Sequence, residues 1–162
     1  MKGLVNAMMK SLEDKNWYGA LTIALIIPDI CGCIDTPNSY SSKRYVRWFD
    51  QYVSHKYYLL QKNTEPGRDS VAISGSDCYA IRCALMHEFS SDLEKQRAHE
   101  LLTKYTFSSP GNIYFAYQLR CNESGNVIDI NVSDFCEKMR IGFSIWEREK
   151  QPVYDNLLKV NF

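Results

Sequence analysis

The chain has 162 residues, of which 45% are hydrophobic and 13% aromatic, and its 19 basic and 19 acidic residues cancel to a formal net charge of zero. This length predicts one domain with a sizeable core, and the aromatic content excludes an intrinsically disordered chain. The neutral balance excludes a global basic field for nucleic acid, so any RNA contact has to depend on a local patch or on a groove between two subunits.

The six cysteines are expected to be free thiols. The first apolar run of the chain is too short for a signal peptide, so we expect a cytoplasmic protein, and the cytosol keeps thiols reduced. Cys31-Gly-Cys33 lacks a second ligand pair of matching spacing, so the sequence predicts neither a metal nor a cofactor. Ala20 to Ile34 is apolar but is expected to be too short to span a membrane, and Pro28 and Asp29 interrupt it.

Hydrophobic spacing predicts three helices in the first part of the chain, over residues 2–13, 17–34 and about 43–60. The second of these is so apolar that it belongs in the middle of a bundle, although Pro28 can kink it. Ser42 can cap the third. Loops are expected at 35–42 and 63–69 from their Pro, Gly, Asn and Ser content.

A fourth helix is predicted from about residue 75 to residue 89, because Ser74 and Asp77 have the spacing of a capping box. One side of it is apolar, and the opposite side carries hardly any polar residue. These two sides consist of Cys78, Ile81, Leu85 and Phe89, and of Tyr79, Ala80, Cys83 and His87. A helix that is apolar all round is covered on both sides, so we expect the domain on one side and a second subunit on the other.

The pattern changes after a polar helical segment at 92–104. Two runs rich in strand formers flank a loop at 122–126, which predicts a β-hairpin at about 113–132. Ser133 or Asp134 then caps a C-terminal helix over about 133–150, and Pro152 is expected to break the chain. The sequence therefore predicts a mainly α domain over residues 1–162, a bundle of four to five helices with one late hairpin that packs on the bundle or a partner.

The segment Arg82-Cys-Ala-Leu-Met-His87 resembles the signature of the HEPN superfamily (higher eukaryotes and prokaryotes nucleotide-binding domains). Ribonucleases of this superfamily carry an arginine, four to six residues and then a histidine on one helix. A polar residue, often asparagine, usually follows the arginine, whereas this chain has Cys83. The resemblance in motif covers residues 74–90, and the helical context extends it loosely from residue 1 to about 105. It implies a HEPN-like bundle and a homodimer in which two such helices form a composite cleft for RNA.

The chemistry that this resemblance implies is metal-independent RNA cleavage, in which a ribose 2′-OH attacks the adjacent phosphate. His87 would transfer protons, because an imidazole titrates near neutral pH. Arg82 would hold the phosphate through its fork of donors and stabilise charge in the transition state. The resemblance also implies a role in a toxin–antitoxin or antiviral defence system, with an antitoxin or regulatory protein as a further partner.

Ser76, Asp77 and Tyr79 are the candidate substrate-binding residues beside this motif. The helix N-terminus from Gly75 to Asp77 can offer N–H groups to an anion, Asp77 can orient Arg82, and Tyr79 can contact a base. Structural alternatives are a cap for Ser76, a first-turn charge for Asp77 and an interface contact for Tyr79, the last of which we favour.

A second basic cluster could contact phosphates with aromatic stacking nearby, although a solvated helix face is the preferred interpretation. It consists of Lys43, Arg44 and Arg47 with Tyr40 and Tyr45.

Two alternatives to an enzyme stay open. The first is a catalytically silent HEPN-like module that binds nucleotide, RNA or a protein, which Cys83 and the neutral charge favour. The second is an interaction protein in which Arg82 pairs with a carboxylate and His87 stabilises a dimer.

Five residues on a helix place Arg82 and His87 roughly 140° apart and ~7.5 Å along the axis, so one helix alone does not build a site.

Overall fold

The computed structural model describes residues 1–59, 70, 71, 73–86, 104–109, 111, 117–122 and 125–157. Within these residues the chain is mainly helical, as predicted. The helices are α1 (Lys2–Glu13), α2 (Trp17–Asp35), α3 (Ser41–Tyr52), the 3-10 helix η1 (Ser54–Tyr57), α4 (Gly75–Met86) and α6 (Val132–Leu157). The strands are β1 (Tyr58–Leu59), β2 (Ser70–Val71), β3 (Tyr105–Ser108), β4 (Tyr117–Asn122) and β5 (Gly125–Asn131).

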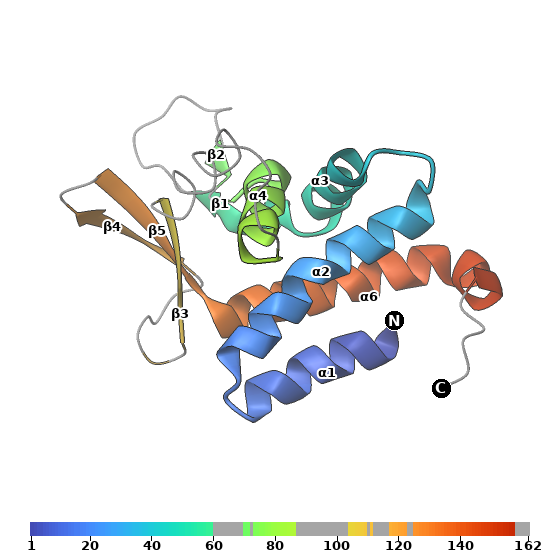
Figure 1. Ribbon diagram of the computed structural model, residues 1–162, viewed down its shortest axis with the longest axis horizontal. Helices are drawn as coiled ribbons and strands as arrows, with labels where there is room; N and C mark the ends of the chain where they lie inside the picture. The colour runs from blue at the N-terminus through green and yellow to red at the C-terminus, as the bar shows by residue number, and fades with distance from the viewer. Residues whose placement is uncertain are drawn as a thin grey trace.

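The helices form the body of the molecule, and a three-stranded sheet lies at one end (Figure 1). α2 and α6 cross the centre, with α1 on one side of them and α3 and α4 on the other. β5 passes directly into α6, the longest helix, with no loop between them. α2 is the second helix predicted from the sequence, and its central position is confirmed.

The sheet has the strand order β3–β5–β4. β4 and β5 form the predicted antiparallel hairpin, in which Asn122 is paired with Gly125. β3 was not predicted; it runs parallel to β5 and pairs Tyr105 with Ile128. The predicted hairpin is therefore confirmed, and β3 adds a third strand to it. A four-residue strand has little stability of its own, and β3 exists because β5 lies beside it.

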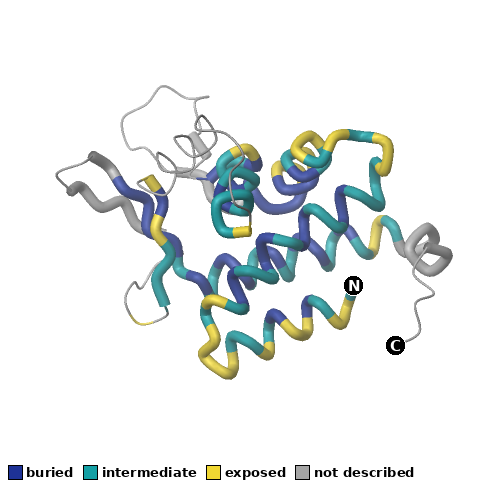
Figure 2. The backbone as a smooth tube through the Cα atoms, in the orientation of Figure 1, coloured by how far each residue is buried: buried dark blue, intermediate teal, exposed yellow. Residues whose placement is uncertain are grey.

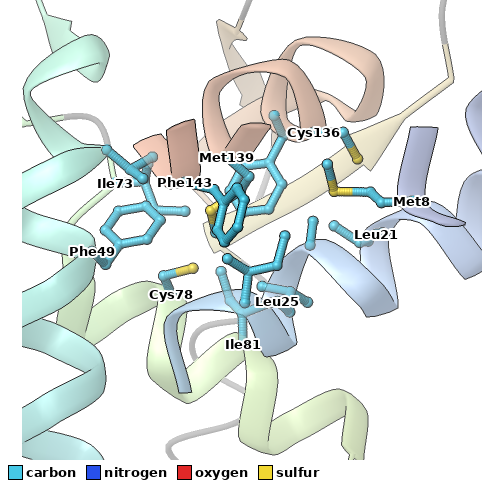
Figure 3. Close-up of a cluster of buried hydrophobic side chains, with 14 of the residues drawn as sticks. Met8, Leu21, Leu25, Phe49, Ile73, Cys78, Ile81, Cys136, Met139 and Phe143 are labelled. Carbon is cyan, nitrogen blue, oxygen red and sulfur yellow. The ribbon is translucent and has the colours of Figure 1, made fainter. Parts of the chain in front are cut away.

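The buried side chains form one cluster between the helices and the sheet. Figure 3 shows its centre, where side chains from α1, α2, α3, α4 and α6 meet. Phe49, Cys78, Ile81 and Met139 are fully buried there. Figure 2 shows exposed residues along the outer faces of α1 and α3, as expected for amphipathic surface helices. α4 is exposed only near its two ends, at Ser76 and Met86.

α2 is one continuous helix, with Pro28 inside it. The helix extends beyond the apolar stretch from Ala20 to Ile34, and its 19 residues could cross a membrane by length and composition alone. Core helices pass the same test, and eight residues of α2 are buried in the bundle. The side chain of Asn16 accepts the Gly19 N–H at 3.0 Å and caps the start of the helix.

Several predicted helix boundaries are wrong. α3 begins at Ser41 rather than after Ser42 and ends at Tyr52, before η1 and β1, instead of continuing to residue 60. α6 continues past Pro152 to Leu157. The side chain of Asn131 caps the start of α6, because it accepts the N–H groups of Ser133 and Asp134 at 3.0 and 3.3 Å. The predicted caps, Ser133 and Asp134, are therefore donors to the cap and not the cap itself. The predicted loop at 63–69 and most of the polar segment at 92–104 lie outside the described residues.

Gly32 marks the closest approach of α2 to α3. A Cβ at this position would lie 2.6 Å from the backbone oxygen of Arg44, which is inside any normal contact distance. The absence of a side chain therefore allows the two helices to touch.

We expect Gly32→Ala to lower the free energy of unfolding by about 1–3 kcal/mol, because the added methyl has to push two backbones apart. Urea denaturation followed by circular dichroism measures this change. Gly3→Ala on α1 is the control, since nothing lies within 4 Å of a Cβ there. The control should stabilise the protein by up to about 1 kcal/mol through helix propensity. Equal effects of the two substitutions would contradict the close contact.

Candidate functional site

The predicted capping box at the start of α4 is confirmed. The hydroxyl of Ser74 donates to Asp77 Oδ2 at 2.8 Å, and the Asp77 N–H donates back to Ser74 Oγ at 3.2 Å. Asp50 of α3 accepts the Gly75 N–H at 2.7 Å. The N–H groups of Gly75 and Asp77 are thus engaged within the protein, so the expectation that both are offered to an anion is wrong.

Asp77 also connects α4 to the sheet. The hydroxyl of the buried Tyr105 on β3 donates to Asp77 Oδ2 at 2.9 Å. Burial, followed by the charge of Asp77, raises the pKa of Tyr105 well above its usual range, so this donor keeps its proton. Asp77 therefore caps α4 and links it to β3. These contacts agree with the structural alternative for this residue, a first-turn charge.

The carboxylate that holds Arg82 is Asp29 of α2. Arg82 Nη2 donates to Asp29 Oδ2 at 2.7 Å, and the two side chains are 15% and 17% exposed. The sequence by itself indicates Asp29 only as an interruption of an apolar stretch. The signal that could have identified it is the presence of one acid in a helix that the sequence already placed in the core, since a charge in that setting needs a partner.

Arg44 of α3 shares the same carboxylate. Its Nη2 lies 3.6 Å from Asp29 Oδ1, and Ser41 Oγ lies 3.4 Å from that oxygen. Arg44 Nη1 is 3.5 Å from the Ser39 carbonyl oxygen. Two guanidinium groups therefore surround one carboxylate where α2, α3 and α4 meet. We call Asp29, Arg44 and Arg82 the arginine–aspartate cluster, and its formal charge is +1.

Tyr79 lies next to this cluster, on α4. Its ring packs edge to face on Tyr45 of α3, with the centroids 5.3 Å apart. Burial raises the pKa of Tyr79, against a smaller lowering by the neighbouring side chain of Ser41. Contacts within one chain thus account for its position, while its predicted place at a subunit interface stays a prediction.

Ser76 is exposed and lies apart from the cluster. It lines an open depression of about 410 Å³ together with four residues of α3, which are Ser42, Lys43, Val46 and Arg47. The three candidate substrate-binding residues are therefore not gathered in one place. Ser76 lies at the depression, Asp77 contacts β3, and Tyr79 lies beside the cluster.

The other half of the motif, His87, lies outside the described residues. Cys83, which follows the arginine, is half-buried, and its Sγ is 4.0 Å from Arg82 Nη1. Among the residues described here, no group of three or more His, Cys, Asp or Glu side chains is placed to hold a metal ion.

No protein-family model matches the chain, and no curated protein or solved structure matches it. The site therefore has to be interpreted from its own geometry and from the motif.

The five cysteines whose side chains are described are free thiols, and they fall into two environments. Cys78 and Cys136 are fully buried, and burial raises the pKa of each thiol to about 12. Cys33 and Cys83 are half-buried. Only a thiolate reacts with an alkylating reagent, so burial should decide which cysteines are modified.

We expect iodoacetamide at pH 8 to modify Cys33 and Cys83 before Cys78 and Cys136. At this pH a thiol with a pKa of about 12 is ionised to roughly 1 part in 10,000, so Cys78 and Cys136 should react slowly, and burial also keeps the reagent from them. Peptide mass mapping after timed quenching measures the four rates. In 6 M urea the rates should converge, and a Cys78 that reacts as fast as Cys83 in the folded protein would contradict the burial described here.

Proposed function

We propose that this chain is a metal-independent endoribonuclease of the HEPN type, which acts as a homodimer and uses Arg82 and His87. The observation that carries the proposal is the arginine–aspartate cluster. The arginine of the motif is on a capped helix, hydrogen-bonded to Asp29 at 2.7 Å, with Arg44 on the same carboxylate.

This arrangement suits a phosphate-binding arginine for two reasons. A carboxylate that grips one edge of a guanidinium restricts its rotation, so less conformational freedom is lost when the substrate binds. Arg44 offsets the charge of Asp29, which would otherwise repel a phosphate. With two cations and one anion, the cluster retains a formal charge of +1 at positions that are 15–20% exposed.

In the proposed reaction, the 2′-oxygen of a ribose forms a bond to the adjacent phosphorus, and the bond from phosphorus to the 5′-oxygen breaks. One imidazole accepts the 2′-OH proton, and another donates a proton to the departing 5′-oxygen. In a homodimer the two copies of His87 can divide these roles. Arg82 stabilises the charge that develops on the phosphoryl oxygens. The products are a 2′,3′-cyclic phosphate and a free 5′-OH.

The setting of this activity is proposed from the motif resemblance alone. It comprises a cytoplasmic protein of a toxin–antitoxin or antiviral defence system, with cellular or viral RNA as substrate and an antitoxin or regulatory protein as partner.

A catalytically silent module that binds RNA or nucleotide is the second candidate. The short contact between Arg82 and Asp29 favours it, because a guanidinium already bound to a carboxylate must share its donors with any phosphate. RNA binding by the wild type without cleavage, weakened by Arg82→Ala, would select this candidate.

The catalytic proposal predicts that Arg82→Ala and His87→Ala each reduce RNA cleavage at least a hundredfold, with the fold retained. Arg82→Lys should restore little, because an ammonium group cannot bind phosphate bidentately. Cleavage is measured on mixed RNA in EDTA, with product ends analysed for cyclic phosphate. Arg140→Ala, which removes an arginine paired with Glu137 on the surface of α6, is the matched control and should cleave normally.

Two results would refute this mechanism. One is cleavage of a substrate with a 2′-deoxy residue at the scission site, because that substrate lacks the proposed nucleophile. The other is full activity of the His87→Ala variant.

The dimer proposal places the second subunit on the side of α4 that carries Ala80 and Cys83, both half-buried in one chain. We expect wild type to be a dimer and Ala80→Glu to be a monomer by light scattering, because a charge buried without a partner is costly. Ala7→Glu, the same substitution at an exposed position of α1, is the control and should stay dimeric. A wild type that is monomeric at micromolar concentration would exclude the composite site.

A further inference from the structure

We propose that α3 and the start of α4 carry a binding surface for single-stranded RNA, separate from the arginine–aspartate cluster. We call it the α3 surface; it consists of Tyr40, Ser42, Lys43, Arg47 and Ser76. The identity of its ligand rests on the proposed function, whereas its location follows from the geometry of the described residues.

The centre of the α3 surface is the open depression of about 410 Å³. Its lining has two cations, Lys43 and Arg47, two hydroxyl groups, Ser42 and Ser76, and the aliphatic side chain of Val46. Lys43 and Arg47 are four residues apart on one helix and so lie on the same face, with Cβ atoms about 6 Å apart. Ammonium, guanidinium and hydroxyl groups all donate hydrogen bonds, which a phosphate backbone accepts.

These cations differ from most others of the described chain because they have no carboxylate partner among the described residues. Neither Lys43 nor Arg47 forms an ion pair with any carboxylate among the described residues, whereas Arg44 and Arg82 do. Asp50, one turn after Arg47, accepts the Gly75 N–H at the start of α4. Its charge is thereby directed at the helix terminus. The α3 surface thus presents positive charge that no carboxylate in the described part of the chain neutralises.

Tyr40 supplies the second requirement for single-stranded RNA. It precedes α3 and is 78% exposed, the most exposed of the large hydrophobic side chains described. Lys43 Nζ lies 5.8 Å from the centroid of its ring. In proteins that bind single-stranded nucleic acid, an exposed aromatic ring stacks on a base while nearby cations contact the phosphate backbone. Tyr40 and the basic depression have this arrangement. An acidic peptide would use the cations but would leave Tyr40 without a base to stack on.

The α3 surface also leads towards the proposed catalytic arginine. Arg44, in the arginine–aspartate cluster, follows Lys43 directly in the chain. Ser76 precedes Arg82 by six residues on α4, which is about 9 Å along the helix axis. Six residues also turn the helix by about 120° in net terms, so a strand bound in the depression would reach Arg82 by crossing the surface of α4. The α3 surface would supply affinity that the neutral net charge does not provide.

Fluorescence anisotropy with a labelled 12-nucleotide 2′-O-methyl oligouridine tests this inference. The 2′-oxygen of this probe is blocked, so the probe cannot be cleaved by the proposed mechanism. We expect Lys43→Gln/Arg47→Gln to weaken binding at least tenfold. The slope of log K against log salt should also fall by about 1.4, since each phosphate contact in a single strand contributes about 0.7. Tyr40→Ala should weaken binding about tenfold with an unchanged slope, because stacking releases no counterions.

The matched control is Lys15→Asn/Arg148→Gln, which removes the same charge from two other exposed positions. Asparagine suits position 15 because the backbone there has a φ of 58°. This control should bind within twofold of wild type.

Three outcomes would overturn the inference. The wild type does not bind the probe, or Lys43→Gln/Arg47→Gln binds it as tightly as the control Lys15→Asn/Arg148→Gln does. The third outcome is that polyglutamate displaces the probe as effectively as unlabelled oligouridine does. Binding through Lys43 and Arg47 by a protein that cleaves no RNA would support the α3 surface and refute the nuclease. Cleavage by wild type with normal probe binding by Lys43→Gln/Arg47→Gln would refute only the α3 surface.

Discussion

The carboxylate of Asp29 connects three helices of this protein. It lies on α2, the central helix, and meets Arg82 of α4 at 2.7 Å and Arg44 of α3 at 3.6 Å. A charge at a position that is only 17% exposed would destabilise the fold without such partners. The same contacts also determine where Arg82 lies. The position of the motif arginine therefore depends on one acidic residue of the central helix.

Close helix packing makes this cluster possible. Gly32, three residues after Asp29, lets the backbone of α2 touch that of α3 at Arg44. At the start of α4, Asp50 accepts the Gly75 N–H. Asp77 belongs to the capping box there and also accepts the hydroxyl of Tyr105. α4 is thus fixed at its start and in its second half, which suits the proposed role of Arg82 in binding a phosphate.

The structure separates two kinds of positive charge. In the arginine–aspartate cluster the guanidinium groups are partly buried and share a carboxylate, which favours fixed geometry over strong attraction. On the α3 surface Lys43 and Arg47 are exposed and have no carboxylate partner among the described residues, which favours attraction over fixed geometry. A neutral chain can in this way combine a local site for a polyanion with a positioned arginine, although it has no global field.

The local features of this protein were determined by its sequence alone. The spacing of apolar residues predicts α1 and α2, Ser74 and Asp77 predict the start of α4, and the runs around residues 122–126 predict the hairpin, because each depends on neighbours in the chain. What depends on contacts distant in sequence was decided only by the tertiary structure. β3 needs β5 beside it, α6 continues through Pro152, and Arg82 pairs with a residue 53 positions earlier. No local pattern distinguishes Asp29 from Asp77 as the partner of Arg82, because that choice follows from the packing of α2 against α4.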